Sequence, residues 1–204
     1  MNGTENSIKV VGKYLRELSV VVAGIAITVF SGLWINNRNN EKDIQLYLEN
    51  IKLELQNNLE DVYGTKEYYD RAAHYSDYLS THQMQNLNPD TLSQYSDLTM
   101  ILTFFTYRTS AFDMLKSSGM MRLIKNKNQV MSIWNCYDAL EFLKTINDFY
   151  TQRKVALVEK FNMFETGSIK QELLFGFFAN EMNKNWVKFF DIYSKQIEET
   201  IAQL

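Results

Sequence analysis

Two histidines and one cysteine are the side chains of this sequence best suited to metal binding or nucleophilic chemistry. His74 follows Asp70 by four residues and precedes Asp77 by three, so a helix would bring both carboxylates near its ring. A structural zinc site usually has four protein ligands rich in His or Cys, and this set is incomplete. We interpret the group as a solvated polar helix face, with divalent metal binding as the alternative.

Cys136 stands between Trp134 and Tyr137 in an apolar helical pattern. A nucleophilic cysteine needs a nearby base that lowers its pKa, and neither histidine lies near it in the sequence. We therefore interpret Cys136 as a buried structural thiol. The sequence also lacks the phosphate-binding loop, the dinucleotide-binding glycine motif and the Gly-x-Ser-x-Gly motif. We predict a protein that is not an enzyme and has no cofactor and no metal.

A basic segment between Phe105 and Lys127 departs from the average charge of the chain. Its net charge is +4, in a chain of 204 residues whose formal charge is −3. Cations, hydroxyls, a glycine turn and a helix start are groups that hold phosphate oxygens. We predict that a small anionic ligand binds the following residues: Arg108, Lys116, Ser117, Ser118, Arg122, Lys125, Asn126 and Lys127. The alternative is a basic surface that pairs with acidic neighbours or faces lipid head groups.

The composition limits the class of protein further. One Pro and eight Gly exclude collagen-like and Pro/Gly-rich disordered chains, and they disfavour a many-turned β-sandwich. A single cysteine excludes an intramolecular disulfide framework and any multi-cysteine metal site. The slight acidic excess argues against a general nucleic-acid binder, so long DNA or RNA is not an expected partner.

An apolar run from Leu18 to Ile35 holds 18 residues without a charge. As a helix it would be about 27 Å long, enough for the hydrocarbon core of a bilayer. Trp34 near its distal edge is a residue type that favours the membrane interface. We predict an N-terminal flank over 1–17 and a retained transmembrane helix over 18–35. A cleaved signal peptide and a buried core helix are the alternatives.

Gly24, Thr28 and Gly32 recur every four residues within this run and form one stripe on a helix. Small-residue stripes let helix backbones approach closely, so this stripe predicts packing between copies in an oligomer. The alternative is that membrane helices are simply rich in Gly and Thr. Lys and Arg are balanced on the two sides of the run, so the positive-inside rule does not give its orientation.

The predicted soluble domain covers residues 36–204. Its first residues, NNRNNEKD, contain no Pro or Gly, so the membrane helix can continue as a helical stalk. Apolar residues then recur at spacings of three and four from Ile44 to Val62. This seam predicts either a short coiled-coil stalk or a helix that packs on its own domain. It lasts under three heptads, which favours the second interpretation. The helical pattern extends to about Leu79.

A second helical stretch is predicted from Pro89 or Ser96 to Lys116, with Asn88 as the N-cap. Its centre, 98–109, is rich in Thr, Phe and Tyr, so a strand is the alternative there.

The sequence from 117 to the end predicts a turn, a short apolar piece and two long helices. The turn covers 117–119, and a break at 126–128 precedes the first long helix, which runs to about Phe164. Gly167 suits its C-cap, and Ser168 opens the last helix. The predicted fold is therefore all-α, with one N-terminal transmembrane helix and a soluble helical domain whose core is rich in aromatic residues.

Three stretches carry a resemblance to a known group of proteins. They are the span with its flank, which ends in Ile35-Asn36-Asn37, the segment TSAFDMLKSSG over 109–119, and RLIKN over 122–126. Together they resemble a widespread uncharacterised bacterial family of small membrane-anchored helical proteins. The resemblance implies a single-pass protein of the bacterial inner (cell) membrane and implies no activity.

In size, span and basic segment the sequence is also similar in architecture to small membrane effectors of type III CRISPR immunity. Some of those effectors bind cyclic oligoadenylate as tetramers and then disturb the membrane. This resemblance implies a homo-oligomer, with a tetramer as one form, whose cytoplasmic domain binds a cyclic oligonucleotide messenger in antiviral defence. Binding would perturb the span or open a pore. The alternative function is a membrane-tethered helical protein-interaction module of the cell envelope, with a periplasmic domain.

Overall fold

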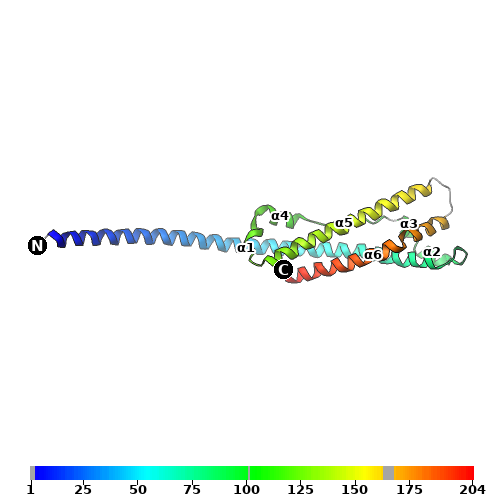
Figure 1. Ribbon diagram of the computed structural model, residues 1–204, viewed down its shortest axis with the longest axis horizontal. Coiled ribbons are helices and arrows are strands. Elements are labelled where there is room, and N and C mark those ends of the chain that lie inside the picture. The colour runs from blue at the N-terminus through cyan, green and yellow to red at the C-terminus, as the bar shows by residue number, and fades with distance from the viewer. Residues whose placement is uncertain (1–2, 101, 163–167) are drawn as a thin grey trace. The chain divides into compact units, whose positions relative to one another are not determined.

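The computed structural model describes the backbone of residues 3–100, 102–162 and 168–204, and the side chains of 18–83, 85–98, 102–156, 159 and 184–204. Within these residues every regular element is a helix and none is a strand, which confirms the predicted all-α class (Figure 1). The elements in chain order are α1 (Gly3–Thr81), η1 (Met84–Asn86), α2 (Pro89–Gln94), α3 (Ser96–Met100), α4 (Ser110–Ser118), η2 (Met120–Leu123), α5 (Lys127–Asn162) and α6 (Ser168–Gln203).

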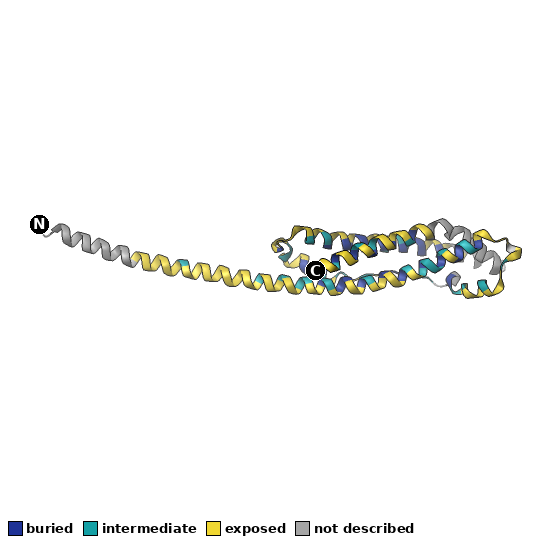
Figure 2. Cartoon of the chain, turned by 90° about the horizontal axis from the view of Figure 1, so that it is seen from below, coloured by how far each residue is buried: buried dark blue, intermediate teal, exposed yellow. Residues whose placement is uncertain are grey.

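The chain divides into two compact units, Met1–Leu46 and Tyr47–Leu204. The first unit contains the N-terminal part of α1, and its segment from Leu18 is long and apolar enough to cross a membrane. None of the side chains in that apolar segment is buried, and Figure 2 shows this part of the helix as exposed almost throughout. The side chains of the predicted flank, 1–17, lie outside the described residues.

The second unit is a bundle in which the rest of α1 packs with α5 and α6. Its centre is aromatic, because the buried ring of Tyr69 in α1 contacts rings from both partner helices. The ring centroids of Tyr150 in α5, Trp186 in α6 and Phe190 in α6 lie 5.2, 5.9 and 5.4 Å away. Edge-to-face and tilted arrangements of this kind stabilise aromatic cores beyond the area that they bury.

The apolar seam of α1 packs on its own domain in the second unit. Ile51, Leu55 and Val62 are fully buried there. The interpretation as a helix that packs on its own domain is thus confirmed for these residues. The spacing of three and four put them on one helix face, and that face is buried in the domain.

The prediction of one helix from Pro89 or Ser96 to Lys116 is wrong. Two short helices, α2 and α3, are followed by residues 102–109, which form no regular element, and α4 begins only at Ser110. The strand alternative is also wrong, because 102–109 contains no strand. Its backbone bonds to side chains of the long helices instead.

Two buried asparagines and a threonine hold this irregular stretch. Asn58 Oδ1 accepts from the backbone N–H of Arg108 at 2.8 Å, and Asn58 Nδ2 donates to the carbonyl oxygen of Arg108 at 2.9 Å. Asn147 Oδ1 accepts from the N–H of Phe105 at 2.8 Å, and Thr151 Oγ1 donates to a carbonyl oxygen, that of Thr103, at 2.9 Å. Buried backbone groups need partners, and these side chains replace the bonds that a helix or sheet would provide.

Local signals for helix ends are confirmed where the structure describes them. Asn88 Oδ1 accepts from the N–H of Asp90 at 2.8 Å, with Pro89 at the first helical position. Gly119 ends α4 at a φ of 69°, the left-handed conformation that favours glycine. The predicted C-cap at Gly167 lies outside the described residues.

Replacing the Asn58 amide should destabilise the helical domain. In Asn58→Ala both backbone groups of Arg108 lose their partner, and we expect the free energy of unfolding to fall by about 2 kcal/mol. Urea denaturation followed by circular dichroism would measure the loss. Asn57→Ala, at the exposed neighbouring position, is the matched control and should change stability by less than about 0.5 kcal/mol. Equal effects of the two variants would contradict the proposed role of the Asn58 amide in holding the backbone of Arg108.

Candidate functional site

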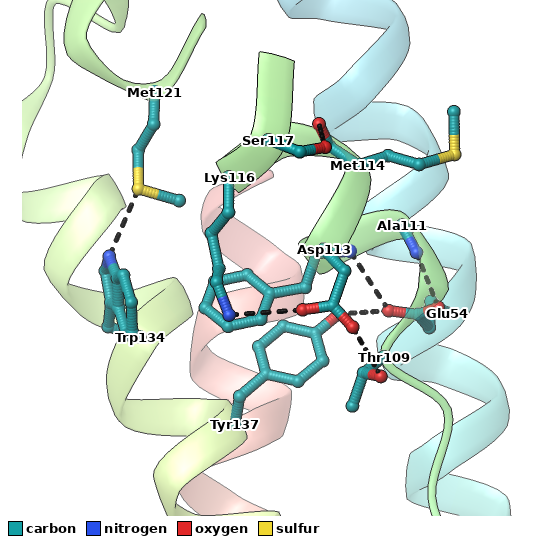
Figure 3. A network of polar contacts seen from close by, with 11 residues as sticks. Glu54, Thr109, Ala111, Asp113, Met114, Lys116, Ser117, Met121, Trp134 and Tyr137 are labelled. Carbon is teal, nitrogen blue, oxygen red and sulfur yellow. Dashed lines mark hydrogen bonds and ion pairs between the residues drawn. The ribbon is translucent and has the colours of Figure 1, made fainter. Parts of the chain in front are cut away.

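A buried carboxylate organises the region that contains the predicted site. Glu54 on α1 accepts from the N–H groups of Ala111 and Phe112 at 2.8 and 3.4 Å, and from the hydroxyl of Tyr137 on α5 at 2.6 Å (Figure 3). The N–H groups belong to the first turn of α4, where unpaired donors and the helix dipole favour a negative charge. Burial, and then the bond to Glu54, raise the pKa of Tyr137, so its hydroxyl stays a donor.

The outer side of α4 carries an ion pair above aromatic rings. Lys116 Nζ lies 3.1 Å from Asp113 Oδ1, and it sits 4.8 and 5.5 Å from the ring centroids of Phe112 and Trp134. Thr109 Oγ1 donates to Asp113 Oδ2 at 2.9 Å. The bond from Thr109, followed by that from Lys116, lowers the pKa of the Asp113 carboxyl. Lys116 is therefore held in place and still half-exposed.

The two serines of the predicted site are used within α4. Ser117 Oγ donates to the carbonyl oxygen of Met114 at 3.1 Å, and Ser118 Oγ donates to that of Leu115 at 2.9 Å. Ser118 Oγ also accepts from the N–H of Met120 at 3.2 Å. These hydroxyls lie at the C-terminal end of a helix, where the dipole is unfavourable to anions. They are poor candidates for a phosphate cradle.

The N-terminus of α5 is closed by its own cap. Asn126 Oδ1 accepts from the N–H groups of Asn128 and Gln129 at 3.1 and 3.3 Å. Lys127 Nζ donates to the carbonyl oxygens of Arg122 and Ile124 at 2.9 and 2.8 Å, which folds its side chain over the preceding turn. Carbonyl oxygens carry no formal charge, so the positive charge of Lys127 is not neutralised. The helix start predicted to bind an anion is thus occupied by Asn126.

Arg108 does not belong to the same cluster of contacts as the other cations. Its Nη1 lies 2.9 Å from Asp61 Oδ2 on α1. A cavity of about 260 Å³ lies beside this ion pair and is lined by Glu60, Asp61, Gly64, Thr65 and residues 103–106. Two carboxylates in its lining make this cavity unsuitable for a phosphate.

The structure thus divides the eight predicted ligand residues into three sets. Arg108 pairs with Asp61, while Ser117, Ser118 and Asn126 satisfy backbone groups at helix ends. The cations that remain along α4, η2 and the start of α5 are four in number: Lys116, Arg122, Lys125 and Lys127. All four are exposed, and we refer to them together as the basic surface.

Neither His74 nor Cys136 has, in the part of the chain that the structure describes, the surroundings that metal binding or catalysis would need. His74 is exposed, but Asp70 pairs with Lys66 at 2.7 Å and Asp77 bonds to Lys184. Among the described residues no group of three or more His, Cys, Asp or Glu side chains converges in a way that could hold a metal ion. Cys136 is buried, and burial raises the pKa of its thiol. A buried thiol with a raised pKa is a weak nucleophile.

Sequence reasoning missed the polar residues that the core uses. Glu54, Asn58 and Asn147 fall in the same helical register as the buried Ile51, Leu55 and Leu143. A polar residue on an otherwise apolar helix face was the available signal, because burial of such a group demands a partner.

Lys154 on α5 is a further buried polar residue that sequence reasoning missed. Its side chain is almost fully buried, and Nζ donates to the carbonyl oxygen of Leu98 at 2.5 Å and to the hydroxyl of Tyr68 at 2.8 Å. Burial lowers the pKa of its amine to about 8. This lysine ties the end of α3 to α5.

The chain matches no protein-family model, no curated protein and no solved structure. The resemblances to the membrane-anchored bacterial family and to CRISPR effectors therefore stay predictions.

Lys154 should make the stability of the domain depend on pH. Between pH 8 and 10 the unfolded chain holds a proton on this amine that the folded chain has lost, so stability rises with pH. Lys154→Met lacks this contribution. The stability of the wild type minus that of the variant should therefore increase by about 1 kcal/mol per pH unit in this window. Urea denaturation at pH 7 to 10 would measure it, and a difference independent of pH would refute the assignment.

Proposed function

We propose that this chain is a single-span membrane protein, not an enzyme, whose helical domain binds anionic groups through its basic surface. One observation carries the proposal: the apolar segment of α1 from Leu18 has no buried side chain. Val20, Ile27 and Phe30 expose 67, 67 and 70% of their surface. Apolar side chains of a soluble protein avoid this degree of exposure along a whole helix, whereas lipid covers such a surface.

This observation also bears on the two rival interpretations. A core helix would bury the segment, and the segment has no buried side chain. A cleaved signal peptide calls for a small-residue site after a short apolar region, and the best site in the sequence, 29–31, contains Val and Phe. A retained anchor in the bacterial cell membrane is the interpretation that these features favour.

The basic surface supports the anion-binding part of the proposal. Residues 114–137 contain four cations and no acidic residue, although the whole chain carries −3. The cytoplasmic effector of a cyclic oligonucleotide in antiviral defence, which opens a pore as a homo-oligomer, remains one version of this proposal. The serines at 117 and 118 do not support that version, because they already bond to carbonyl oxygens.

A second candidate function, a tethered protein-interaction module of the envelope, has its own support. Phe149 on α5 and Phe189 on α6 are 45 and 37% exposed, and Phe142 lies 5.4 Å from Phe189 between ring centroids. Exposed aromatic rings on neighbouring helices are typical of protein interfaces. A reporter fused after Leu204 that is active only in the periplasm would favour this candidate over a cytoplasmic effector.

The anchor can be tested by extraction of membranes with alkaline carbonate. The wild-type chain, expressed in bacteria, should stay in the pellet and keep residues 1–35 by mass spectrometry. Ile25→Lys combined with Val29→Lys should release it, because each central lysine costs about 3 kcal/mol of insertion free energy. Leu46→Lys combined with Leu53→Lys, two exposed leucines outside the segment, is the control and should stay in the pellet. Extraction of the wild type, or loss of its first 35 residues, would reject the anchor.

Self-association of the anchor can be tested separately. Nothing lies within 4 Å of a Cβ built at Gly24 or Gly32 among the described residues, and Thr28 Oγ1 bonds to the carbonyl oxygen of Gly24 at 2.9 Å, so a partner helix has room. Gly24→Leu with Gly32→Leu should abolish chemical cross-linking between copies in membranes. Ala26→Leu, on the opposite side of the helix, should not. Cross-linking that survives the double variant would remove the stripe from the interface.

A further inference from the structure

The geometry points to a lipid-docking surface on the helical domain, made by η2 and the adjoining ends of α4 and α5, whose partner is the anionic head groups of the membrane. The inference rests on the proposed function, because it assumes that the α1 segment anchors the chain. It names lipid phosphate as the anionic group that the basic surface binds.

The cations of this surface lie in one region of the domain. Lys116 Nζ lies above the ring of Trp134 on α5, and Trp134 Nε1 donates to the sulfur of Met121 in η2 at 3.2 Å (Figure 3). Lys127 bonds to the carbonyl oxygens of Arg122 and Ile124. These contacts join α4, η2 and the start of α5 into one continuous surface.

The charge of this surface is complementary to anionic lipid. Lys116 pairs with the carboxylate of Asp113. Arg122 and Lys125 are exposed, and Lys127 bonds to neutral carbonyl oxygens. With Asp113 included, residues 113–137 carry +3 and the chain carries −3, so the remainder carries −6. The domain as a whole therefore gains no attraction to an anionic membrane, and orientation of this surface toward the membrane supplies it.

Apolar side chains stand exposed among these cations. Leu123 in η2 is 39% exposed, and Met131 on α5 is 58% exposed. Met131 shares a helix face with Trp134, three residues later. Cations beside Leu, Met and Trp are the composition of surfaces that rest in the head-group region, where charge meets phosphate and apolar groups reach the acyl boundary. A free soluble anion gives no reason for the exposed Leu and Met.

The proposed anchor limits how far the start of the second unit can lie from the bilayer. Twelve residue steps separate Ile35, the last residue of the predicted span, from Tyr47, the first residue of the second unit. Their chain can reach at most about 40 Å. Within the second unit, the first turn of α4 lies near the start of that unit, because the N–H groups of Ala111 and Phe112 bond to Glu54, seven residues after Tyr47. Tethering at this distance raises the local lipid concentration, so weak contacts suffice.

The test uses the full chain in lipid nanodiscs, with Leu123→Cys carrying an environment-sensitive fluorophore. Cys136 is buried, so the introduced thiol is the reactive one. In discs of phosphatidylcholine with one quarter phosphatidylglycerol, the emission should shift to the blue and iodide quenching should fall. Discs of phosphatidylcholine alone, or 0.5 M salt, should reverse both changes, because salt screens the attraction.

A charge-reversal pair identifies the surface. Arg122→Glu with Lys125→Glu should lower the ratio of docked to undocked probe by at least about 30-fold, since each lost cation contributes about fivefold and the two new carboxylates are repelled by anionic lipid. Lys188→Glu with Lys195→Glu, two exposed cations on α6, makes the same change of charge and should leave the ratio unchanged.

Three outcomes would overturn the inference. The probe could stay in water in the anionic discs, both charge reversals could act equally, or cyclic tetra-adenylate could shift the emission in discs of phosphatidylcholine alone. The last outcome would assign the surface to a soluble anion. Failure of the anchor itself would appear differently, because the chain would then not co-purify with discs of either composition.

Discussion

The helical domain depends on one buried carboxylate. Removing a carboxylate from water costs several kcal/mol, so Glu54 can be buried only where donors meet its oxygens. Those donors come from the first turn of α4 and from Tyr137 on α5. The carboxylate therefore fixes α4 against α1 and α5. The position of α4 in turn fixes the position of the basic surface, which continues from α4 into η2.

The long connection between α1 and α5 shows the same constraint. Its irregular part, 102–109, has no helix or sheet in which to pair its backbone, so Asn58 and Asn147 supply hydrogen bonds from the core. Lys154 does the same for the end of α3. Each of these polar side chains would be costly in a purely apolar core. Here each side chain also fixes the position of the backbone group to which it bonds in the connection between α1 and α5.

Positive charge and exposed apolar side chains are concentrated in one segment of this domain. Residues 114–137 contain four cations and no acidic residue, and Leu123 and Met131 are exposed in the same range. The rest of the chain carries a net negative charge. Under the proposed function, an anionic bilayer would attract this basic surface and repel the acidic remainder.

The sequence by itself determined the features that depend on neighbours within a few residues. Helical periodicity in α1, α5 and α6, the cap at Asn88 and the turn at Gly119 were predicted correctly, because hydrogen bonds to i+2 through i+4 create them. Only the tertiary structure decided the break over 102–109 and the roles of Glu54 and Asn58. Their partners lie about 50 residues away in the chain, where local spacing carries no information. For the same reason the predicted ligand residues divided: Arg108 pairs with Asp61 on α1, 47 residues earlier in the chain, and the four other cations lie along α4, η2 and the start of α5.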